Sequence, residues 1–396
     1  MLWRDSEAPR LANPRVIALL LDQALVASPQ NPALHTKRAY VFLDRYDFAS
    51  AAAQFEAAAD LTALSTQDRA RLARCYNMLG RWQDTLDLLS ELDEPQFERA
   101  AAYLKLGQAT SAERELRATL ASEPNDHRAW RLLWRLLRDS DRIQYMLEFC
   151  EELDSHGARN AQFFFNWGWA LALGGDMQRA SRLLMEVDHI QERALELPNG
   201  FVDIATFNDA LTEEILTNDN RLSDFPETEE ANRGSSRVEN LYAGKRPELI
   251  RLLLETLLKH AEAYRCSPRV GFDPWPRARP VRAHVKAWGL LQGRNAYEAA
   301  HIHPGGWISG VYYVRVPRSV DANGNGAGCI EFGPPAGLAG KMPGAAPTWR
   351  YAPGEGRFLL APSHYPHRTI PNPEDEQRIS VAFDIVPDLG ADGIED

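Results

Sequence analysis

The sequence HIHPGGWISGVYY, residues 301–313, decides the fold of this chain, because two closely spaced histidines precede a strand-like run. His301 and His303 are separated by one residue, so on a β-strand their side chains project from the same face. A third histidine, His367, follows 64 residues after His303, behind another strand-like run and a proline-bounded turn. Three imidazoles with this spacing can meet around one metal ion if a small β-barrel folds the segment back on itself. We therefore predict a metal site formed by His301, His303 and His367.

An arginine and a serine follow the third histidine. Arg378 opens the run RISVAF (residues 378–383), which alternates as a strand should, so Arg378 and Ser380 share one face. A guanidinium is the natural bidentate partner of a carboxylate, and a hydroxyl adds a second contact. This spacing predicts that Arg378 and Ser380 bind an acidic co-substrate beside the metal.

The first half of the chain differs from the second in composition and in the spacing of its apolar residues. Residues 1–190 are rich in Ala, Leu, Arg and Glu, with apolar residues at helical spacing. Short turn-like segments such as LGRW (79–82), LGQA (106–109) and GGDM (174–177) interrupt this pattern. Gly107 and Gly175 are 68 residues apart, which is twice the 34-residue period of tetratricopeptide repeats. We predict four to five degenerate repeats of this type in a helical solenoid, with an irregular helical bundle as the alternative.

Residues 191–264 join the two halves. The polar, acidic stretch Asp219–Arg237 has no periodicity and predicts a loop or lid. Pro247–Tyr264 predicts an amphipathic helix that buttresses the following domain. Residues 265–396 are rich in Gly and Pro, with short β-branched runs, and predict a domain of strands and turns.

Composition excludes several classes of protein. The formal net charge of −11 argues against a general nucleic-acid binder. The apolar run Val16–Leu21 is short and flanked by charges, so neither a signal peptide nor a membrane span is expected. The four cysteines are scattered without a CxxC pair, which favours reduced thiols in a cytoplasmic protein. The sequence does not indicate an oligomeric state.

Residues from about 200 to 386 resemble a known family in the order of their motifs. These motifs are Trp288, His301-Ile302-His303-Pro304, Ser309-Gly310-Val311-Tyr312-Tyr313, Gly328-Cys329-Ile330-Glu331-Phe332-Gly333-Pro334-Pro335, Pro362-Ser363-His364-Tyr365-Pro366-His367 and Arg378-Ile379-Ser380. The pattern is similar to that of the bacterial and phage 2-oxoglutarate/Fe(II) oxygenases. The resemblance implies a double-stranded β-helix (a jelly-roll or cupin-like fold), Fe(II) and O₂ at the metal site, and 2-oxoglutarate as the co-substrate.

The second ligand position departs from the wider superfamily, in which HxD or HxE is usual. Three neutral imidazoles leave Fe(II) with more net positive charge, which favours anionic co-ligands. Alternatively, Glu331 or Glu298 supplies an oxygen ligand in place of one histidine of the pair. Cupin-type thiol and diketone dioxygenases also use three histidines and need no 2-oxoglutarate, but Arg378 and Ser380 argue against that interpretation.

The resemblance implies a dioxygenase, and two tyrosines are further candidates for binding the co-substrate. Tyr297 lies four residues before His301, and Tyr312 alternates with Tyr313, so one of that pair faces the barrel interior. Because a solenoid offers a concave surface, we expect a hydroxylase of a peptide or protein substrate. The alternatives are a small-molecule oxygenase whose repeats serve oligomerisation and a non-catalytic tetratricopeptide scaffold with a metal-binding barrel.

Overall fold

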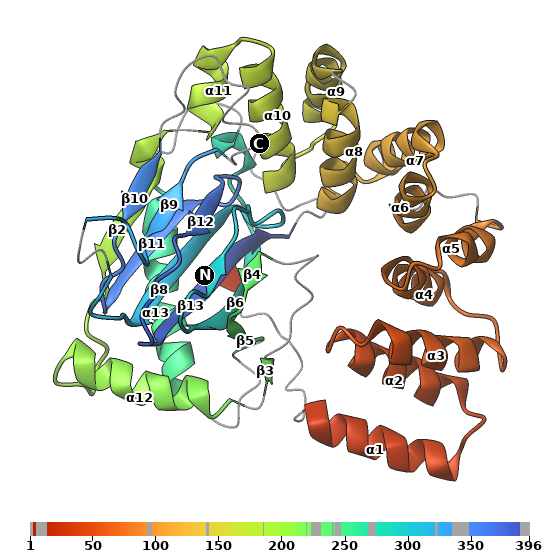
Figure 1. Ribbon diagram of the computed structural model, residues 1–396, viewed down its shortest axis with the longest axis horizontal. Helices are drawn as coiled ribbons and strands as arrows, with labels where there is room; N and C mark the ends of the chain where they lie inside the picture. Colours follow the sequence, from red (N-terminus) through yellow and green to blue (C-terminus); the bar gives the residue numbers. More distant parts are fainter. Residues whose placement is uncertain are drawn as a thin grey trace. The chain divides into compact units, whose positions relative to one another are not determined.

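A computed structural model describes residues 3–4, 14–92, 97–139, 142–184, 186–218, 220–222, 231–239, 241, 247–267, 275–320, 324–334 and 348–388 (Figure 1). The chain divides into two compact units. One comprises Leu11–Tyr145 and Glu151–Ala158, and the other comprises Met1–Arg10, Met146–Cys150 and Arg159–Asp396. The predicted domain boundaries at residues 190 and 264 stay predictions.

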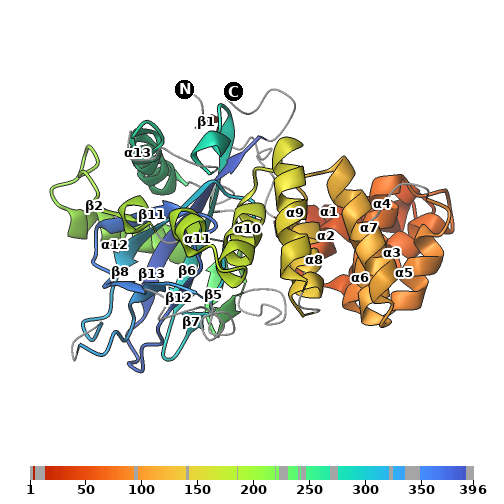
Figure 2. The ribbon, with the colours of Figure 1, turned by 90° about the horizontal axis from the view of Figure 1, so that it is seen from above.

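The first unit consists of helices stacked in pairs (Figure 1, Figure 2), with α2 against α3, α4 against α5, and α6 against α7. Side chains cap several helix starts: Asn31 accepts a hydrogen bond from the backbone of Ala33, and Ser65 accepts one from Asp68. The helices up to residue 155 are α1 (Pro14–Ala27), α2 (Pro32–Leu43), α3 (Phe48–Ala59), α4 (Thr66–Met78), α5 (Trp82–Leu89), α6 (Phe97–Lys105), α7 (Ala109–Ser122), α8 (His127–Asp139) and α9 (Ile143–Ser155).

The predicted helical repeats are confirmed. Gly80 (φ 75°) and Gly107 (φ 74°) end α4 and α6 in the left-handed conformation that only glycine adopts at little cost. The LGRW and LGQA segments are therefore turns within helix pairs. The GGDM turn separates α10 (Ala161–Leu173) from α11 (Met177–Leu184), and both of these helices belong to the second unit.

The second unit contains the predicted double-stranded β-helix, which is confirmed by its strand order. The larger sheet runs β2-β11-β8-β13-β6-β5-β3, with β1 also paired to β6. The smaller sheet runs β10-β9-β12, and an isolated bridge between His301 and His367 joins the β7 segment to β12. The barrel strands are β6 (Ala283–Gln292), β7 (Tyr297–Glu298), β8 (Ile308–Arg315), β9 (Ile330–Phe332), β10 (Trp349–Tyr351), β11 (Arg357–Pro362), β12 (His367–Thr369) and β13 (Arg378–Pro387).

The predicted loop at Asp219–Arg237 is wrong at both of its ends. β3 (Arg221–Leu222) pairs with β5 (Ser236–Val238), and β5 pairs in turn with β6, so these residues extend the larger sheet. Between them, β4 (Asn232–Arg233) pairs with β7. Residues 223–230 lie outside the described part of the chain. The remaining short strands are β1 (Trp3–Arg4) and β2 (Gln191–Ala194).

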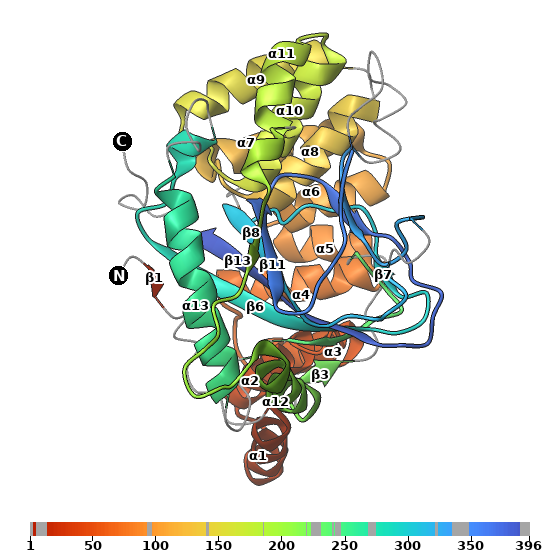
Figure 3. The ribbon, with the colours of Figure 1, turned by 90° about the vertical axis from the view of Figure 1, so that its left-hand side faces the viewer.

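Two helices support the outer face of the larger sheet. The predicted buttressing helix is present as α13 (Glu248–Arg265), which lies along the sheet (Figure 3) and packs His260 against Phe358 of β11. Helix α12 (Ile204–Leu216) contacts β8, and its Glu214 accepts hydrogen bonds from the first backbone N–H groups of α13. These contacts hold β8 and β11 in place, and β8 borders the strand that carries Arg378. Within the described residues, no helix has the length and apolar character needed to cross a membrane.

Candidate metal centre

The structure brings His301, His303 and His367 together. One ring nitrogen of each lies within 4.8 Å of the corresponding atom of the other two. The ring centroids are 4.4 Å apart for His301 and His367, and 5.1 Å apart for each of the other two pairs. The backbone creates this convergence, because His301 and His367 exchange two N–H···O bonds of 3.0 Å each.

The second nitrogen of each ring is held by a protein oxygen. Nδ1 of His301 lies 2.8 Å from the carbonyl oxygen of Ala299, and Nδ1 of His367 lies 3.1 Å from that of Tyr365. Nδ1 of His303 lies 2.6 Å from Oδ1 of Asp384. An Nδ1–H that donates to an oxygen leaves Nε2 unprotonated, with its lone pair available to a metal. The three Nε2 atoms are therefore the potential ligand atoms.

The surroundings of His301 and His367 favour neutral imidazoles. Burial, and then the neighbouring His367 and His303, lower the pKa of His301 well below its ordinary value. Burial and the neighbouring His303 likewise lower the pKa of His367 to about 3. Neutral imidazole is the form that binds transition metals, so His301 and His367 can bind Fe(II) without releasing a proton near pH 7.

Aromatic side chains pack against two of the three rings. Trp288 of β6 stacks on His303, with centroids 5.5 Å apart, and Phe332 of β9 lies 5.4 Å from His367. The guanidinium of Arg237 covers the Trp288 ring at 4.7 Å and forms an ion pair of 2.7 Å with Glu239. These aromatic contacts hold the rings of His303 and His367 in place.

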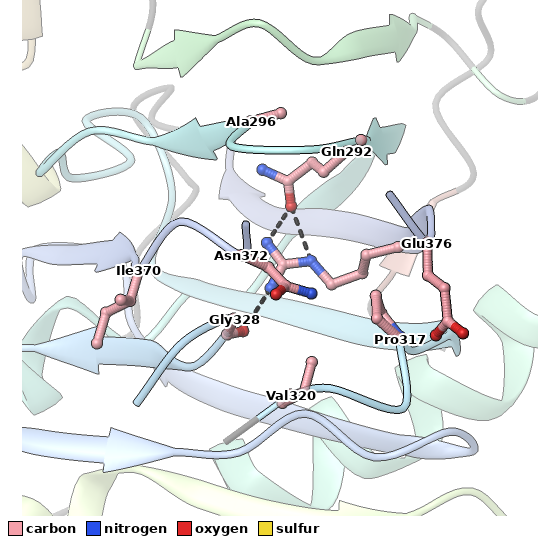
Figure 4. A pocket seen from close by; sticks show the side chains of 10 residues that line it. Gln292, Ala296, Pro317, Val320, Gly328, Ile370, Asn372 and Glu376 are labelled. Carbon is pink, nitrogen blue, oxygen red and sulfur yellow. Dashed lines mark hydrogen bonds between the residues drawn. The ribbon is translucent and has the colours of Figure 1, made fainter. Parts of the chain in front are cut away.

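Arg378 is buried at the start of β13, where it lines a pocket (Figure 4). Its Nη1 donates to the carbonyl oxygen of Gly328 at 2.7 Å, and its Nε and Nη2 both donate to Oε1 of Gln292. Burial lowers the pKa of Arg378 from its ordinary value, although the group remains a cation at any physiological pH.

Gln292, at the end of β6, is a residue that the sequence reasoning missed. Its side chain is 3% exposed, and its Nε2 has no hydrogen-bond partner among the described residues. A buried donor without an acceptor is rare in folded proteins and indicates a group that binds there. A carboxylate would satisfy both this N–H and the Arg378 guanidinium, so the pocket fits an acidic co-substrate. Gln292 ends a strand-like run in the sequence, and only the cross-strand register that pairs it with Arg378 reveals it.

Of the other residues predicted to bind the co-substrate, Ser380 lies beside Arg378 in the strand and Tyr312 lies away from the site. Ser380 is buried two residues after Arg378 on β13, and Tyr297 is partly exposed on β7. Tyr312 is not brought to the site: its hydroxyl donates to Oδ1 of Asn208 in α12 at 2.6 Å, on the outer face of the sheet. Tyr313 faces inward and raises the pKa of Arg378 against the effect of burial. Because side chains alternate along β8, Tyr313 faces inward and the predicted Tyr312 faces outward.

Neither alternative carboxylate belongs to the histidine cluster. Glu331 forms ion pairs with Arg350 (2.6 Å) and Arg368 (2.7 Å), while its neighbour Phe332 faces His367, so Glu331 points to the opposite face of β9. Burial alone would raise the pKa of Glu331, but the hydrogen bonds from these two arginines lower it. Glu298 is buried on β7, and its carboxylate raises the pKa of Arg378 against the effect of burial. Among the described residues, the group that can hold a metal consists of three histidines.

Asp384 is the second residue that the sequence reasoning missed. It is 8% exposed on β13 and accepts hydrogen bonds from His303 Nδ1 and from Oγ of Ser309 at 2.7 Å. Burial alone would raise its pKa, but the His303 ring and these hydrogen bonds lower it, so the carboxylate is ionised at neutral pH. The sequence could have indicated Asp384 as a site residue, because it lies six residues after Arg378 and so shares the same face of the strand.

Comparison with known proteins agrees with this geometry. Residues 286–384 match the model of a family described as "Putative 2OG-Fe(II) oxygenase". No curated protein matches the chain.

Solved structures similar to each part of the chain also exist. A Pseudomonas putida prolyl-4-hydroxylase is 14% identical, with 50% of this chain and 92% of that chain covered and a TM-score of 0.34. The alpha-ketoglutarate-dependent epimerase SnoN from nogalamycin biosynthesis is 16% identical, with 52% and 88% covered and a TM-score of 0.35. YrrB, a TPR protein with an unusual peptide-binding site, is 14% identical, with 42% and 89% covered and a TM-score of 0.32. With TM-scores this low, these likenesses add nothing to the fold that the strand order establishes.

The matched segment begins in β6 and ends at Asp384, so it contains the three histidines, Gln292 and Arg378. The predicted resemblance to the 2-oxoglutarate/Fe(II) oxygenases is thereby confirmed for the part of the chain that forms this site.

Proposed function

We propose that this protein is a non-haem Fe(II)/2-oxoglutarate-dependent dioxygenase that hydroxylates a peptide or protein substrate bound by its helical repeats. The observation that carries the proposal is the orientation of the three histidines. Each ring is turned by an oxygen at Nδ1 so that Nε2 faces the other two rings. Such an arrangement is expected of metal ligands and is unusual for histidines that merely fill a core.

In this proposal, His301, His303 and His367 hold the iron. Arg378 and the free N–H of Gln292 bind the far carboxylate of 2-oxoglutarate, and Ser380 and Tyr297 are candidates for further contacts. Bound iron, 2-oxoglutarate and O₂ supply the oxidising chemistry, in which 2-oxoglutarate is converted to succinate and CO₂. The protein's own contribution is to orient the ligands through Nδ1, to fix the co-substrate with a buried cation, and to exclude water with Trp288 and Phe332.

The substrate class is proposed from the helical unit. Stacked helix pairs of this kind form extended surfaces that bind peptides and protein partners, whereas an enzyme for a small metabolite has no need of them. The site itself does not select between a peptide side chain and a free small molecule. The helical unit therefore supports the peptide hypothesis over the small-molecule alternative.

Anaerobic titration with 2-oxoglutarate tests the oxygenase proposal. The Fe(II)-loaded protein should develop a metal-to-ligand charge-transfer band as 2-oxoglutarate is added, and it should release succinate once O₂ is admitted. Full metal loading with neither the band nor succinate would favour a non-catalytic scaffold.

Mass spectrometry tests the substrate class. The full-length protein, incubated with a peptide library under turnover conditions, should add the mass of one oxygen atom to particular peptides. Succinate release stimulated by small molecules, with no peptide modified, would favour the small-molecule oxygenase.

A further inference from the structure

The contact between Asp384 and His303 has a direct bearing on the charge of the metal site. Asp384 Oδ1 lies 2.6 Å from His303 Nδ1, and the two side chains are only 11% and 10% exposed. Ser309 of β8 donates a second hydrogen bond to the same oxygen, and its Oγ lies 2.8 Å from Oγ of Ser363. Asp384 is therefore an anion held by two donors, one imidazole ring away from the metal position.

The turn after His303 is built to permit this contact. The backbone N–H of His303 donates to the carbonyl oxygen of Ser363, which anchors the turn beside β13. A Cβ added to Gly306 would lie 2.4 Å from Oγ of Ser363 and 3.5 Å from Cβ of Asp384. Only a glycine allows the turn to approach so closely, so the backbone brings His303 and Asp384 together.

Charge balance explains why such a contact matters. A facial set of two histidines and one carboxylate cancels one of the two charges of Fe(II), whereas three neutral imidazoles cancel none. A divalent cation in a buried site is costly unless an anion compensates it. Among the described residues, the carboxylates near the cluster include Glu331, which two arginines already neutralise on the other face of β9, and Asp384, which faces His303. Glu298 is also buried nearby, but its carboxylate interacts with the Arg378 guanidinium.

We propose that Asp384 is a positioning residue that supplies, through His303, the negative charge that other members of the superfamily place directly on the metal. The inference rests on the proposed function. In this arrangement the His303 imidazole would occupy the ligand position, and the Asp384 carboxylate would bind the other nitrogen of that ring. The hydrogen bond to the carboxylate would make the imidazole a stronger donor to the metal.

Metal affinity provides the first test, with Mn²⁺ as a redox-stable probe whose unbound fraction is followed by EPR. Asp384→Asn keeps the size of the side chain and an acceptor for His303 Nδ1 but removes the charge. It should weaken Mn²⁺ binding by roughly 10- to 100-fold. Glu331→Gln is the matched control, because it also removes a buried carboxylate of the barrel (7% exposed, against 8% for Asp384), and it should leave Mn²⁺ affinity unchanged.

A charge transposition provides the decisive test. His303→Asp puts a carboxylate on the metal but leaves Asp384 beside it, so two anions crowd one site. Adding Asp384→Asn to that variant restores a single carboxylate and should tighten Mn²⁺ binding by roughly tenfold relative to His303→Asp alone. Asp384→Asn should thus weaken binding when residue 303 is histidine and strengthen it when residue 303 is aspartate.

The outcomes separate cleanly. The proposal is supported if Asp384→Asn weakens Mn²⁺ binding when residue 303 is histidine and strengthens it when residue 303 is aspartate. Asp384→Asn that weakens binding in both backgrounds, or changes it in neither, overturns the proposal and assigns Asp384 a purely structural role. If Asp384→Asn alone does not fold, as judged by near-UV circular dichroism, the comparison in the His303→Asp background decides. Failure of the unmodified protein to bind Mn²⁺ would instead contradict the proposed function itself.

Discussion

The backbones of His301 and His367 exchange two hydrogen bonds of 3.0 Å each, although four strands, β8 to β11, separate them along the chain. This single bridge closes the smaller side of the barrel and brings the two imidazoles to a centroid distance of 4.4 Å. The site therefore depends on the closure of the barrel as much as on the histidines.

His367→Ala should abolish stoichiometric iron binding, because two imidazoles on one side of the site cannot complete a facial set. The iron content of the purified protein, measured by elemental analysis after anaerobic loading, should fall from near one equivalent to a small fraction of that amount. His284→Ala is the control, since His284 lies on β6 and pairs with Asp388 at 3.0 Å, away from the cluster. Normal iron content in His367→Ala would remove His367 from the ligand set.

Arg378→Ala should raise the 2-oxoglutarate concentration needed for half-maximal succinate release while leaving iron content near normal. Loss of a buried, hydrogen-bonded charge partner costs about 2–5 kcal/mol, which corresponds to a weakening of roughly 30-fold or more. Arg350→Ala is the matched control, because this arginine pairs with Glu331 and is half-exposed. An unchanged 2-oxoglutarate dependence in Arg378→Ala would show that another cation binds the co-substrate.

Gln292→Glu should impair 2-oxoglutarate binding more strongly than Gln292→Ala. The glutamate would form an internal ion pair with Arg378 and oppose the incoming carboxylate, whereas alanine only removes the amide N–H. Anaerobic titration of the Fe(II) form, followed by its charge-transfer band, measures both affinities. Equal affinities in the two variants would mean that the co-substrate does not approach Gln292.

Tyr312→Phe should lower the free energy of unfolding by about 1 kcal/mol, because it leaves the buried Oδ1 of Asn208 without its donor. It should leave the 2-oxoglutarate dependence unchanged, since Tyr312 faces α12. Urea unfolding and succinate assays measure the two effects separately. A marked change in 2-oxoglutarate dependence with normal stability would restore Tyr312 to the site.

Acid should destabilise the protein partly through His364. Burial lowers the pKa of this histidine in the folded state to about 3, below its ordinary value of 6.5. As pH falls from 6.5 towards 3, His364 therefore becomes protonated in the unfolded chain but stays neutral in the folded protein. In that range this group should reduce the free energy of unfolding by about 1.4 kcal/mol per pH unit, and its full contribution should be present above pH 6.5.

His364→Gln tests this slope, because glutamine keeps a donor for the carbonyl oxygen of Leu183 but does not titrate. Urea unfolding between pH 4 and pH 6.5 should show a pH dependence smaller by one proton than in the unmodified protein. His156→Gln, at an exposed histidine of α9's C-terminal end, should retain the original slope. Identical slopes in all three proteins would contradict the assignment.

The sequence alone was sufficient to predict the two kinds of architecture and the three histidines that the fold brings together. The glycine turns at Gly80 and Gly107, each between two amphipathic stretches, predict helix pairs. Glycine ends a helix in the left-handed conformation, and each amphipathic helix must bury its apolar face against another. The order HxH, H, RxS predicts the barrel and the convergence of its three histidines for a local reason as well. Residues two apart on a strand share a face, and this rule needs no knowledge of the rest of the fold.

Only the tertiary structure decided which residues contact the three histidines and Arg378. Whether Tyr312 or Tyr313 faces inward depends on where β8 begins relative to its neighbours, and a shift of one residue reverses every side chain. Gln292 and Asp384 meet Arg378 and His303 only through the pairing of β13 with β6 and through the turn that Gly306 permits. These contacts join residues remote in sequence, and no local pattern encodes them, because they depend on the registers at which the sheets close.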